Sequence, residues 1–219
     1  MSGGHDHPHD HNQPPAPDEE RPPLAFEALE MTIRELLIEK GIITADELRA
    51  TVEFMDTRGE ELGARIVARA WTDPAFKARL LAHGDEAVRA FGVDMRPTEL
   101  CVIENTATVH NLVVCTLCSC YPRPILGVPP AWYKRRDYRA RAVREPRKVL
   151  AEFGTVLPAG VEVRVHDSNA DLRYLVLPRR PDGTEGWSAD RLAGLVSRDS
   201  MVGVALCRQP ADLGRAAAE

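Results

Sequence analysis

Three of the five cysteines in this chain of 219 residues lie in one short segment, Val114-Cys115-Thr116-Leu117-Cys118-Ser119-Cys120. Three thiolates on one loop can bind the same ion without ligands from distant parts of the chain. Thiolates select soft or borderline transition metals. The short spacing also brings the backbone amides of Ser119 and Cys120 to the same point. The segment therefore predicts a self-contained site for one metal ion.

Three other interpretations of the cysteine segment are weaker. Buried cysteines with an accidental spacing would need no ligand. A disulfide would need an oxidising compartment, and no secretory leader indicates one. A zinc ribbon would need a second pair of Cys or His residues at regular spacing, whereas Cys101 and Cys207 are isolated in apolar segments. Free cysteines without a leader therefore also predict a cytoplasmic location.

Length and composition exclude several classes of protein. A chain of this length can bury one sizeable core, or one core with a helical extension. Its 44% hydrophobic and 28% charged residues are typical of an ordinary soluble protein. The formal net charge of -5 gives no reason to expect a nucleic-acid partner. No apolar run approaches the roughly 20 residues that a membrane helix needs.

The sequence predicts three parts with different character. Residues 1–25 are rich in proline and acid and are predicted to be a disordered tail. In this tail His5-Asp-His7-Pro-His9-Asp-His11 is interpreted as a solvated stretch, an affinity tag or a weak metal collector. Residues 26–95 are predicted to form a helical arm, and residues 96–219 an α+β domain that binds the metal.

Periodicity and turn signals predict the individual elements. Helices are expected at 26–40, 44–55, 62–71, 74–91, 129–153 with a break at 145–146, and 188–196. Thr44 and Glu47 predict a capping box at the start of the second helix. Strands are expected at 100–103, 112–114, 161–165, 172–177 and 201–206, with Asp167-Ser-Asn169 as the turn between the third and the fourth. Pro122, Pro124 and Gly127 predict an irregular loop without a helix after the cysteines. Helices and strands mix without regular alternation, which indicates the α+β class.

The segment Cys115-Thr-Leu-Cys118-Ser-Cys120-Tyr-Pro resembles the metal-binding segment of nitrile hydratase alpha subunits and of their relatives, thiocyanate hydrolase gamma subunits. The resemblance extends through 102–106, 109–114, 124–127, 129–134, 138–141, 144–147, 173–178, 183–188 and 198–199. It implies a four-layer α-β-β-α body with an N-terminal helical arm that packs across a beta-type partner subunit.

The resemblance also implies the chemistry of the site. Cys115, Cys118 and Cys120 would supply sulfur, and Ser119 and Cys120 would supply deprotonated backbone nitrogens, to a trivalent ion whose sixth position takes water or substrate. Cys118 would be oxidised to sulfinic acid and Cys120 to sulfenic acid, with arginines of the partner beside them. Thr116 resembles the cobalt type, so cobalt(III) is expected rather than iron(III). Cys118, Ser119 and Cys120 are the predicted catalytic residues.

Two arginines depart from the nitrile hydratase pattern. Arg123 stands where nitrile hydratases commonly have Trp, and Arg96 where the family often has glutamine. Both are predicted to line the substrate pocket and to favour an anionic substrate. Residues 121–127, Tyr-Pro-Arg-Pro-Ile-Leu-Gly, resemble thiocyanate hydrolase, whereas 102–114 and 129–134 are more similar to nitrile hydratase.

The sequence is therefore compatible with three functions. The first is the metal-bearing subunit of a nitrile hydratase, which hydrates a nitrile to the amide. The second is the gamma subunit of a thiocyanate hydrolase, with the anion held by Arg123. The third, of a different class, is a non-enzymatic metal carrier. His110, close before the cysteines, is interpreted as a hydrogen-bonded structural residue and not as a ligand.

Overall fold

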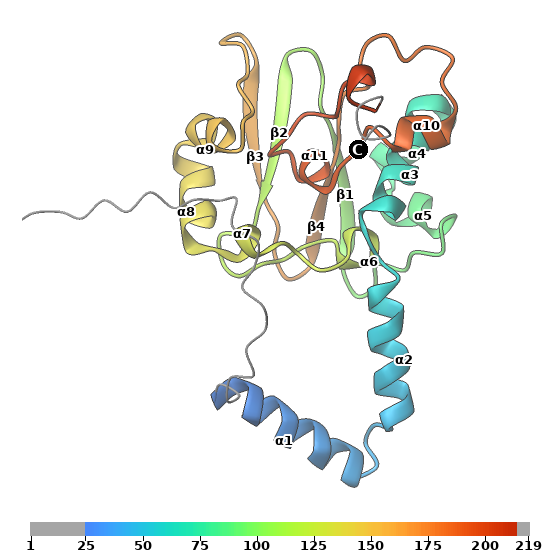
Figure 1. The fold of residues 1–219 in the computed structure, drawn as a ribbon, viewed down its shortest axis with the longest axis vertical. Helices are drawn as coiled ribbons and strands as arrows, with labels where there is room; N and C mark the ends of the chain where they lie inside the picture. The colour runs from blue at the N-terminus through green and yellow to red at the C-terminus, as the bar shows by residue number, and fades with distance from the viewer. Residues whose placement is uncertain (1–24, 214–219) are drawn as a thin grey trace, which may run out of the picture. The chain divides into compact units, whose positions relative to one another are not determined.

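The computed structural model describes residues 25–213 (Figure 1). The histidine-rich tail predicted for residues 1–25 lies outside the described residues, apart from Ala25. The chain divides into two compact units, residues 1–50 and residues 51–219. The boundary expected at residue 95 stays a prediction, and the helices α3 to α5 that precede it pack within the second unit.

The first unit contains helix α1 (Ala25–Glu39) and the start of α2 (Ala45–Asp56), which continues into the second unit. Thr44 and Glu47 form the predicted capping box: the Thr44 backbone N–H donates to Glu47 Oε2 at 2.8 Å, and the Glu47 N–H donates to Thr44 Oγ1 at 3.1 Å. Several large apolar side chains of α1 are exposed, namely Phe26, Leu29, Met31, Ile33 and Leu36.

The second unit opens with α3 (Glu60–Thr72), α4 (Pro74–Ala82) and α5 (Gly84–Arg89). The single helix predicted over 74–91 is wrong, because His83 leaves the helical conformation and divides it into α4 and α5. At Gly84 a Cβ atom would lie 2.4 Å from the backbone oxygen of Leu100. The close approach of this helix to the following strand therefore requires a glycine, and it is a tertiary feature that helical periodicity does not encode.

Within residues 25–213, four strands form two parallel pairs. Strand β1 (Glu99–Glu104) pairs with β4 (Leu172–Leu177), and β2 (Val109–Val114) pairs with β3 (Glu162–Asp167). The two consecutive strands β2 and β3 thus pair with each other, whereas β1 and β4, at the two ends of the strand order, form the other pair, and because both pairs are parallel neither is a hairpin. In the β2–β3 register Val114 lies opposite Asp167. This register brings Asp167 to the residue from which the cysteine segment starts.

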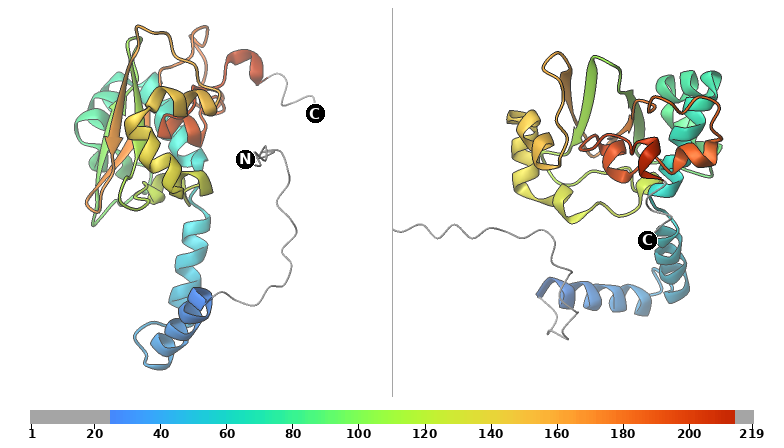
Figure 2. Two further views of the ribbon diagram at one scale, coloured as in Figure 1. Left: turned by 90° about the vertical axis from the view of Figure 1, so that its left-hand side faces the viewer. Right: turned by 45° about the horizontal axis from the view of Figure 1, so that its top comes forward.

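The remaining helices follow the cysteine segment. They are α6 (Arg123–Leu126), α7 (Ala131–Lys134), α8 (Arg136–Arg144), α9 (Pro146–Glu152), α10 (Ala189–Ala193), α11 (Arg198–Val202) and a final 3-10 turn, Pro210–Asp212. Helix α8 packs against β2, α9 against β3, and α4 and α5 against β1. Figures 1 and 2 show α8 and α9 on one side of the strands and α3 to α5 on the other. The predicted mixture of helices and strands is confirmed.

Two local predictions are wrong. Pro122 and Pro124 do not prevent a helix, because proline needs no N–H donor at the start of one, and α6 forms at Arg123–Leu126. The strand predicted at 201–206 is replaced by helix α11, whose start is fixed by reciprocal hydrogen bonds between Ser197 and Ser200. Gly203 ends α11 with φ of 91°, a left-handed conformation that glycine adopts without strain.

One continuous apolar core supports the second unit, with Phe76, Leu80, Leu112, Leu150 and Leu175 among its fully buried side chains. Val113, Val114 and Cys115 are buried in sequence, so the cysteine segment starts from a strand that is anchored in this core. Among residues 25–213, no helix has the length and apolar character needed to cross a membrane.

Candidate metal centre

Strand β2 ends at Val114 and leads directly into the cysteine segment, where three sulfur atoms lie close together. The Sγ atom of Cys118 lies 3.5 Å from that of Cys115 and 3.2 Å from that of Cys120. All three sulfur atoms lie within 4.8 Å of one another. Cys115 is buried, Cys120 is half-buried and Cys118 is exposed. Three soft donors around one point, open to solvent on one side, fit a thiolate-bound transition metal.

The surroundings of Cys118 and Cys120 shift the pKa values of the two thiols in opposite directions. Hydrogen bonds from Cys120 and Cys115 lower the pKa of Cys118 to about 7. Burial raises the pKa of the Cys120 thiol to about 12, while the charge of Arg173 acts in the opposite direction. The Cys118 backbone N–H also donates to Cys115 Sγ at 3.2 Å. Cys118 is thus the readier of this pair to form a thiolate.

A carboxylate from the neighbouring strand holds the cysteine segment. Asp167 accepts from the Thr116 backbone N–H at 2.9 Å and from Thr116 Oγ1 at 2.5 Å. The register places Asp167 opposite Val114, the last residue of β2, and its carboxylate reaches Thr116, two residues further along the chain. Both oxygens of Asp167 are therefore used to fix the residue between the first two cysteines.

Aromatic residues of α7 and α8 fix the same segment from the other end. Tyr133 donates to the carbonyl oxygen of Cys120 at 2.8 Å, and Tyr138 donates to that of Val113 at 2.6 Å. Both rings are buried, and burial raises the pKa of each phenol above its ordinary value. Tyr133 also packs edge-on to Tyr121, with ring centroids 5.1 Å apart. The segment is thus held before and after the cysteines by donors that stay protonated.

A hollow of about 390 Å³ opens beside Cys118, Ser119 and Cys120. Its other lining residues include the three arginines Arg96, Arg123 and Arg173. Arg96 is exposed and pairs with Asp94 at 2.6 Å. In the described part of the chain, no ion pair is formed by Arg123 or Arg173. The accessible side of the sulfur cluster is therefore strongly cationic.

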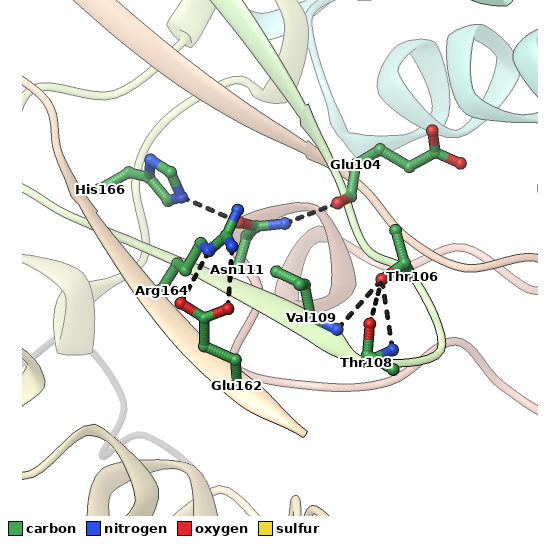
Figure 3. A network of polar contacts seen from close by, with 8 residues as sticks. All are labelled: Glu104, Thr106, Thr108, Val109, Asn111, Glu162, Arg164 and His166. Carbon is green, nitrogen blue, oxygen red and sulfur yellow. Dashed lines mark hydrogen bonds and ion pairs between the residues drawn. The ribbon is translucent and has the colours of Figure 1, made fainter. Parts of the chain in front are cut away.

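Behind β2, a network of polar contacts ties the strands to one another (Figure 3). Asn111 Nδ2 donates to the Glu104 carbonyl at 2.8 Å, and Asn111 Oδ1 lies 2.9 Å from His166 Nε2. Arg164 pairs with Glu162 at 2.8 Å on the edge of β3. The Thr106 hydroxyl accepts from the backbone N–H groups of Thr108 and Val109, which closes the turn before β2.

His110 joins this network instead of the cysteines. Its Nε2 lies 2.7 Å from the Gly203 carbonyl oxygen, and its Nδ1 lies 3.3 Å from Asn105 Nδ2. A carbonyl only accepts, so Nε2 carries the proton and Nδ1 accepts from Asn105. Burial lowers the pKa of His110 below its ordinary value. Both ring nitrogens are occupied by hydrogen bonds, in keeping with the structural role expected for this residue.

A match to a known family shows to which group of proteins the chain belongs. The family described as "Nitrile hydratase, alpha chain" matches residues 25–205. The chain belongs to the nitrile hydratase alpha-chain family. The match includes the cysteine segment, the two parallel strand pairs and helices α1 to α11.

Curated relatives of this nitrile hydratase family member carry both names that the sequence suggests. It is 54% identical over 177 residues to the low-molecular weight cobalt-containing nitrile hydratase subunit alpha of Rhodococcus rhodochrous, covering 80% of this chain and 86% of the relative. It is 48% identical over 193 residues to thiocyanate hydrolase subunit gamma of Thiobacillus thioparus, covering 83% and 79%.

Solved structures of the nitrile hydratase family also share its fold. A recombinant thiocyanate hydrolase comprising partially-modified cobalt centers matches with a TM-score of 0.81 at 46% identity, covering 86% of this chain and 93% of that chain. A mutant Fe-type nitrile hydratase from Comamonas testosteroni Ni1 matches with a TM-score of 0.79 at 40% identity, covering 84% and 91%.

In this nitrile hydratase alpha-type chain, the residues singled out from the sequence lie together. Cys118, Ser119 and Cys120 share one hollow with Arg96 and Arg123, and Cys115 lies within 4.8 Å of the other two sulfur atoms. Their roles in binding metal or substrate stay predictions.

Three further residues of the site were missed by sequence reasoning. Asp167 was interpreted only as part of a turn, and Arg173 only as part of a family segment. Tyr133 was likewise assigned only to a family segment. Asp167 lies 51 residues from its partner Thr116, and only the pairing of β2 with β3 brings the two together. The one available signal was that Asp167 follows one predicted strand and Arg173 lies at the start of the next.

Proposed function

We propose that this chain is the metal-bearing subunit of a nitrile hydratase, which hydrates a nitrile to the corresponding amide. The observation that supports it most directly is the convergence of three sulfur atoms on one loop, within a chain of the nitrile hydratase alpha family. Cys118, Ser119 and Cys120 border the hollow in which the substrate would bind.

We propose cobalt(III) as the metal, because relatives at 54% and 49% identity are named cobalt-containing nitrile hydratases. Iron(III) is the second candidate, because an Fe-type nitrile hydratase is among the similar structures. The sulfur atoms of Cys115, Cys118 and Cys120 and the backbone nitrogens of Ser119 and Cys120 would hold the ion. Such an ion supplies Lewis acidity toward the nitrile or toward water.

Oxidation of Cys118 to sulfinic acid and of Cys120 to sulfenic acid is part of this proposal. Cysteine oxidation follows thiolate character and exposure. Cys118 satisfies both conditions, since it is exposed and has a lowered pKa. Arg173 lines the same hollow and carries a positive charge toward Cys120, so this chain would supplement arginines of a partner in holding the added oxygens.

The proposal extends to architecture and assembly. The four-layer α-β-β-α order is supported by α8 and α9 beside β2 and β3 and by α4 and α5 beside β1. The arm proposed for 26–95 and the catalytic domain proposed for 96–219 would join a beta-type subunit in the cytoplasm. The exposed apolar side chains of α1 support a partner, because a helix stripe of this kind is normally covered.

A thiocyanate hydrolase gamma subunit is the second candidate function, and the arginine-lined hollow favours it. A fixed guanidinium can hold a linear anion beside the sulfur cluster, whereas a neutral nitrile gains little from the same charge. Charge-assisted contacts contribute about 1.5–3 kcal/mol, which is roughly ten- to a hundredfold in selectivity. The non-enzymatic carrier is disfavoured if the metal is trivalent cobalt, which exchanges its ligands too slowly for delivery.

Replacing Arg123 by Trp tests which substrate the hollow prefers. The measurement is kcat/KM for thiocyanate and for a small aliphatic nitrile, with the complex of this chain and its beta-type partner. We expect Arg123→Trp to raise the ratio of nitrile to thiocyanate activity about ten- to a hundredfold, with the metal content unchanged. Arg123→Lys, which keeps the charge, should stay near the wild-type ratio.

Each possible result has a defined meaning. An unchanged ratio in Arg123→Trp would contradict a contact between Arg123 and the substrate and would favour a salt bridge from Arg123 to an acid of the partner subunit. Nitrile turnover by the wild-type complex supports the leading function. Thiocyanate turnover without nitrile turnover supports the second candidate. No turnover of either compound by a metal-loaded complex would contradict both enzymatic functions and support the carrier.

A further inference from the structure

A second hollow, of about 570 Å³, adjoins the cysteine segment. Thr116 and Leu117 line it from the segment, and the rest of its lining comes from α8: Arg136, Arg139, Ala140, Val143 and Arg144. This hollow shares no lining residue with the one that contains Cys118, Ser119 and Cys120. The metal-binding segment thus borders two separate surfaces, of which only one presents the sulfur atoms of Cys118 and Cys120.

The charges of this second surface are not compensated within the described chain. Over residues 25–213, no ion pair is formed by Arg136, Arg139 or Arg144. Arg141 on the same helix behaves differently, because it pairs with Glu145 at 2.5 Å and also with Glu152. Asp137, the single acid within α8, does not line the hollow. One face of α8 therefore concentrates positive charge in a chain whose formal net charge is -5.

Two apolar side chains are exposed on the same surface. Leu117 is 83% exposed and Val143 is 51% exposed. Leu117 follows Thr116, whose carbonyl oxygen lies 3.4 Å from Nη1 of Arg139. Apolar anchors bordered by arginines are typical of protein interfaces, where arginine is enriched relative to the rest of the surface. Phosphate groups of a nucleic acid would use the arginines but would leave the two apolar side chains without a partner.

We propose that this arginine face, defined as Arg136, Arg139 and Arg144 with Leu117 and Val143, docks a carboxylate-bearing segment of the beta-type subunit. The inference rests on the proposed function, which supplies that subunit. Carboxylates of the partner pair with the guanidinium groups, and apolar side chains of the partner cover Leu117 and Val143. Arg139 also contacts the carbonyl oxygen of Thr116 in the metal-binding segment. A partner that binds this face therefore also acts, through Arg139, on the loop that carries the cysteines.

Charge reversal on α8 tests this docking face. Arg136→Glu with Arg144→Glu changes two exposed arginines of the face, and Arg65→Glu with Arg89→Glu changes two exposed arginines elsewhere by the same total charge. The Kd for the beta-type subunit is measured at low and at high salt for the full chain and both double variants. We expect the α8 variant to bind at least about tenfold more weakly and with a smaller salt dependence than the control.

A second pair of variants tests the apolar part independently. Val143→Asp should weaken binding of the beta-type subunit, whereas Val156→Asp, at an exposed site outside the face, should not. Retained metal in the isolated variants shows that the loop is intact. Equal Kd values for test and control variants would overturn the docking face alone. A wild-type chain that binds no beta-type subunit would overturn the proposed assembly itself. Binding to double-stranded DNA that is lost only in the α8 variant, with partner affinity unchanged, would assign the face to nucleic acid instead.

Discussion

At the scale of single residues, Asp167 is the group that links the fold to the metal-binding segment. Its two oxygens accept from the backbone N–H and the hydroxyl of Thr116, the residue between Cys115 and Cys118. A loop that carries metal ligands is mobile unless other groups hold it, and such supporting groups commonly matter ten- to a hundredfold, roughly, for metal affinity. Asp167 acts through Thr116, so it is a positioning residue.

Removing the Asp167 carboxylate should weaken metal binding without unfolding the chain. We expect Asp167→Ala to lower the affinity for cobalt by roughly ten- to a hundredfold. Asp167→Asn should lower it less, because its amide still offers an acceptor to the Thr116 N–H. Metal content after dialysis against a chelator is the measurement, with circular dichroism as the test of folding. Asp171→Ala removes an exposed acid nearby and serves as the control. Equal metal retention in Asp167→Ala and the control would contradict this role.

At the scale of elements, strand β2 is held by buried polar residues as well as by the apolar core. Asn105, His110 and Asn111 are all buried, and Asn105 Oδ1 accepts from both the backbone and the side chain of Asn111. His110 connects β2 to the carbonyl of Gly203 at the end of α11. Gly203 itself lies so close to Asn111 that a Cβ atom would meet the Asn111 carbonyl oxygen at 2.0 Å.

The lowered pKa of His110 predicts a loss of stability in mild acid. In the unfolded chain His110 has its ordinary pKa of 6.5, whereas in the folded chain its pKa is lower. Between these two pKa values the unfolded chain binds the proton more readily, so the free energy of unfolding falls as the pH falls from 6.5 to the lowered pKa of the folded chain. We expect the wild-type free energy of unfolding to fall below pH 6.5, and His110→Gln to show a smaller fall. Urea unfolding at several pH values measures this. His166, whose pKa is also lowered by burial, is unchanged in both proteins.

The exposed residue His83 supplies the control for this measurement. His83→Gln should retain the wild-type dependence on pH, because its side chain is outside the buried network. A dependence in His110→Gln as steep as that of wild type would show that His110 does not titrate with folding.

At the scale of the whole molecule, local signals and long-range contacts were predictable to different degrees. Features that depend on neighbouring residues could be predicted from the sequence. They are the cysteine segment, the Thr44–Glu47 capping box and the mixed α and β content. The division at His83 and the helix at Arg198–Val202 depend on contacts with Leu100 and Asn111, which periodicity does not contain. Asp167 and Arg173 reach the site only through the parallel pairing of strands far apart in the chain.

The central claim, that one metal is held by the cysteine segment, is tested most directly by elemental analysis. The full chain is purified with its beta-type partner after growth with cobalt, as wild type and as Cys115→Ala, Cys118→Ala and Cys120→Ala. We predict stoichiometric cobalt in wild type and in the control Cys101→Ala, and none in the three other variants. Each of these three removes one of the sulfur atoms that lie within 4.8 Å of one another. Full cobalt content in all three variants would contradict the account.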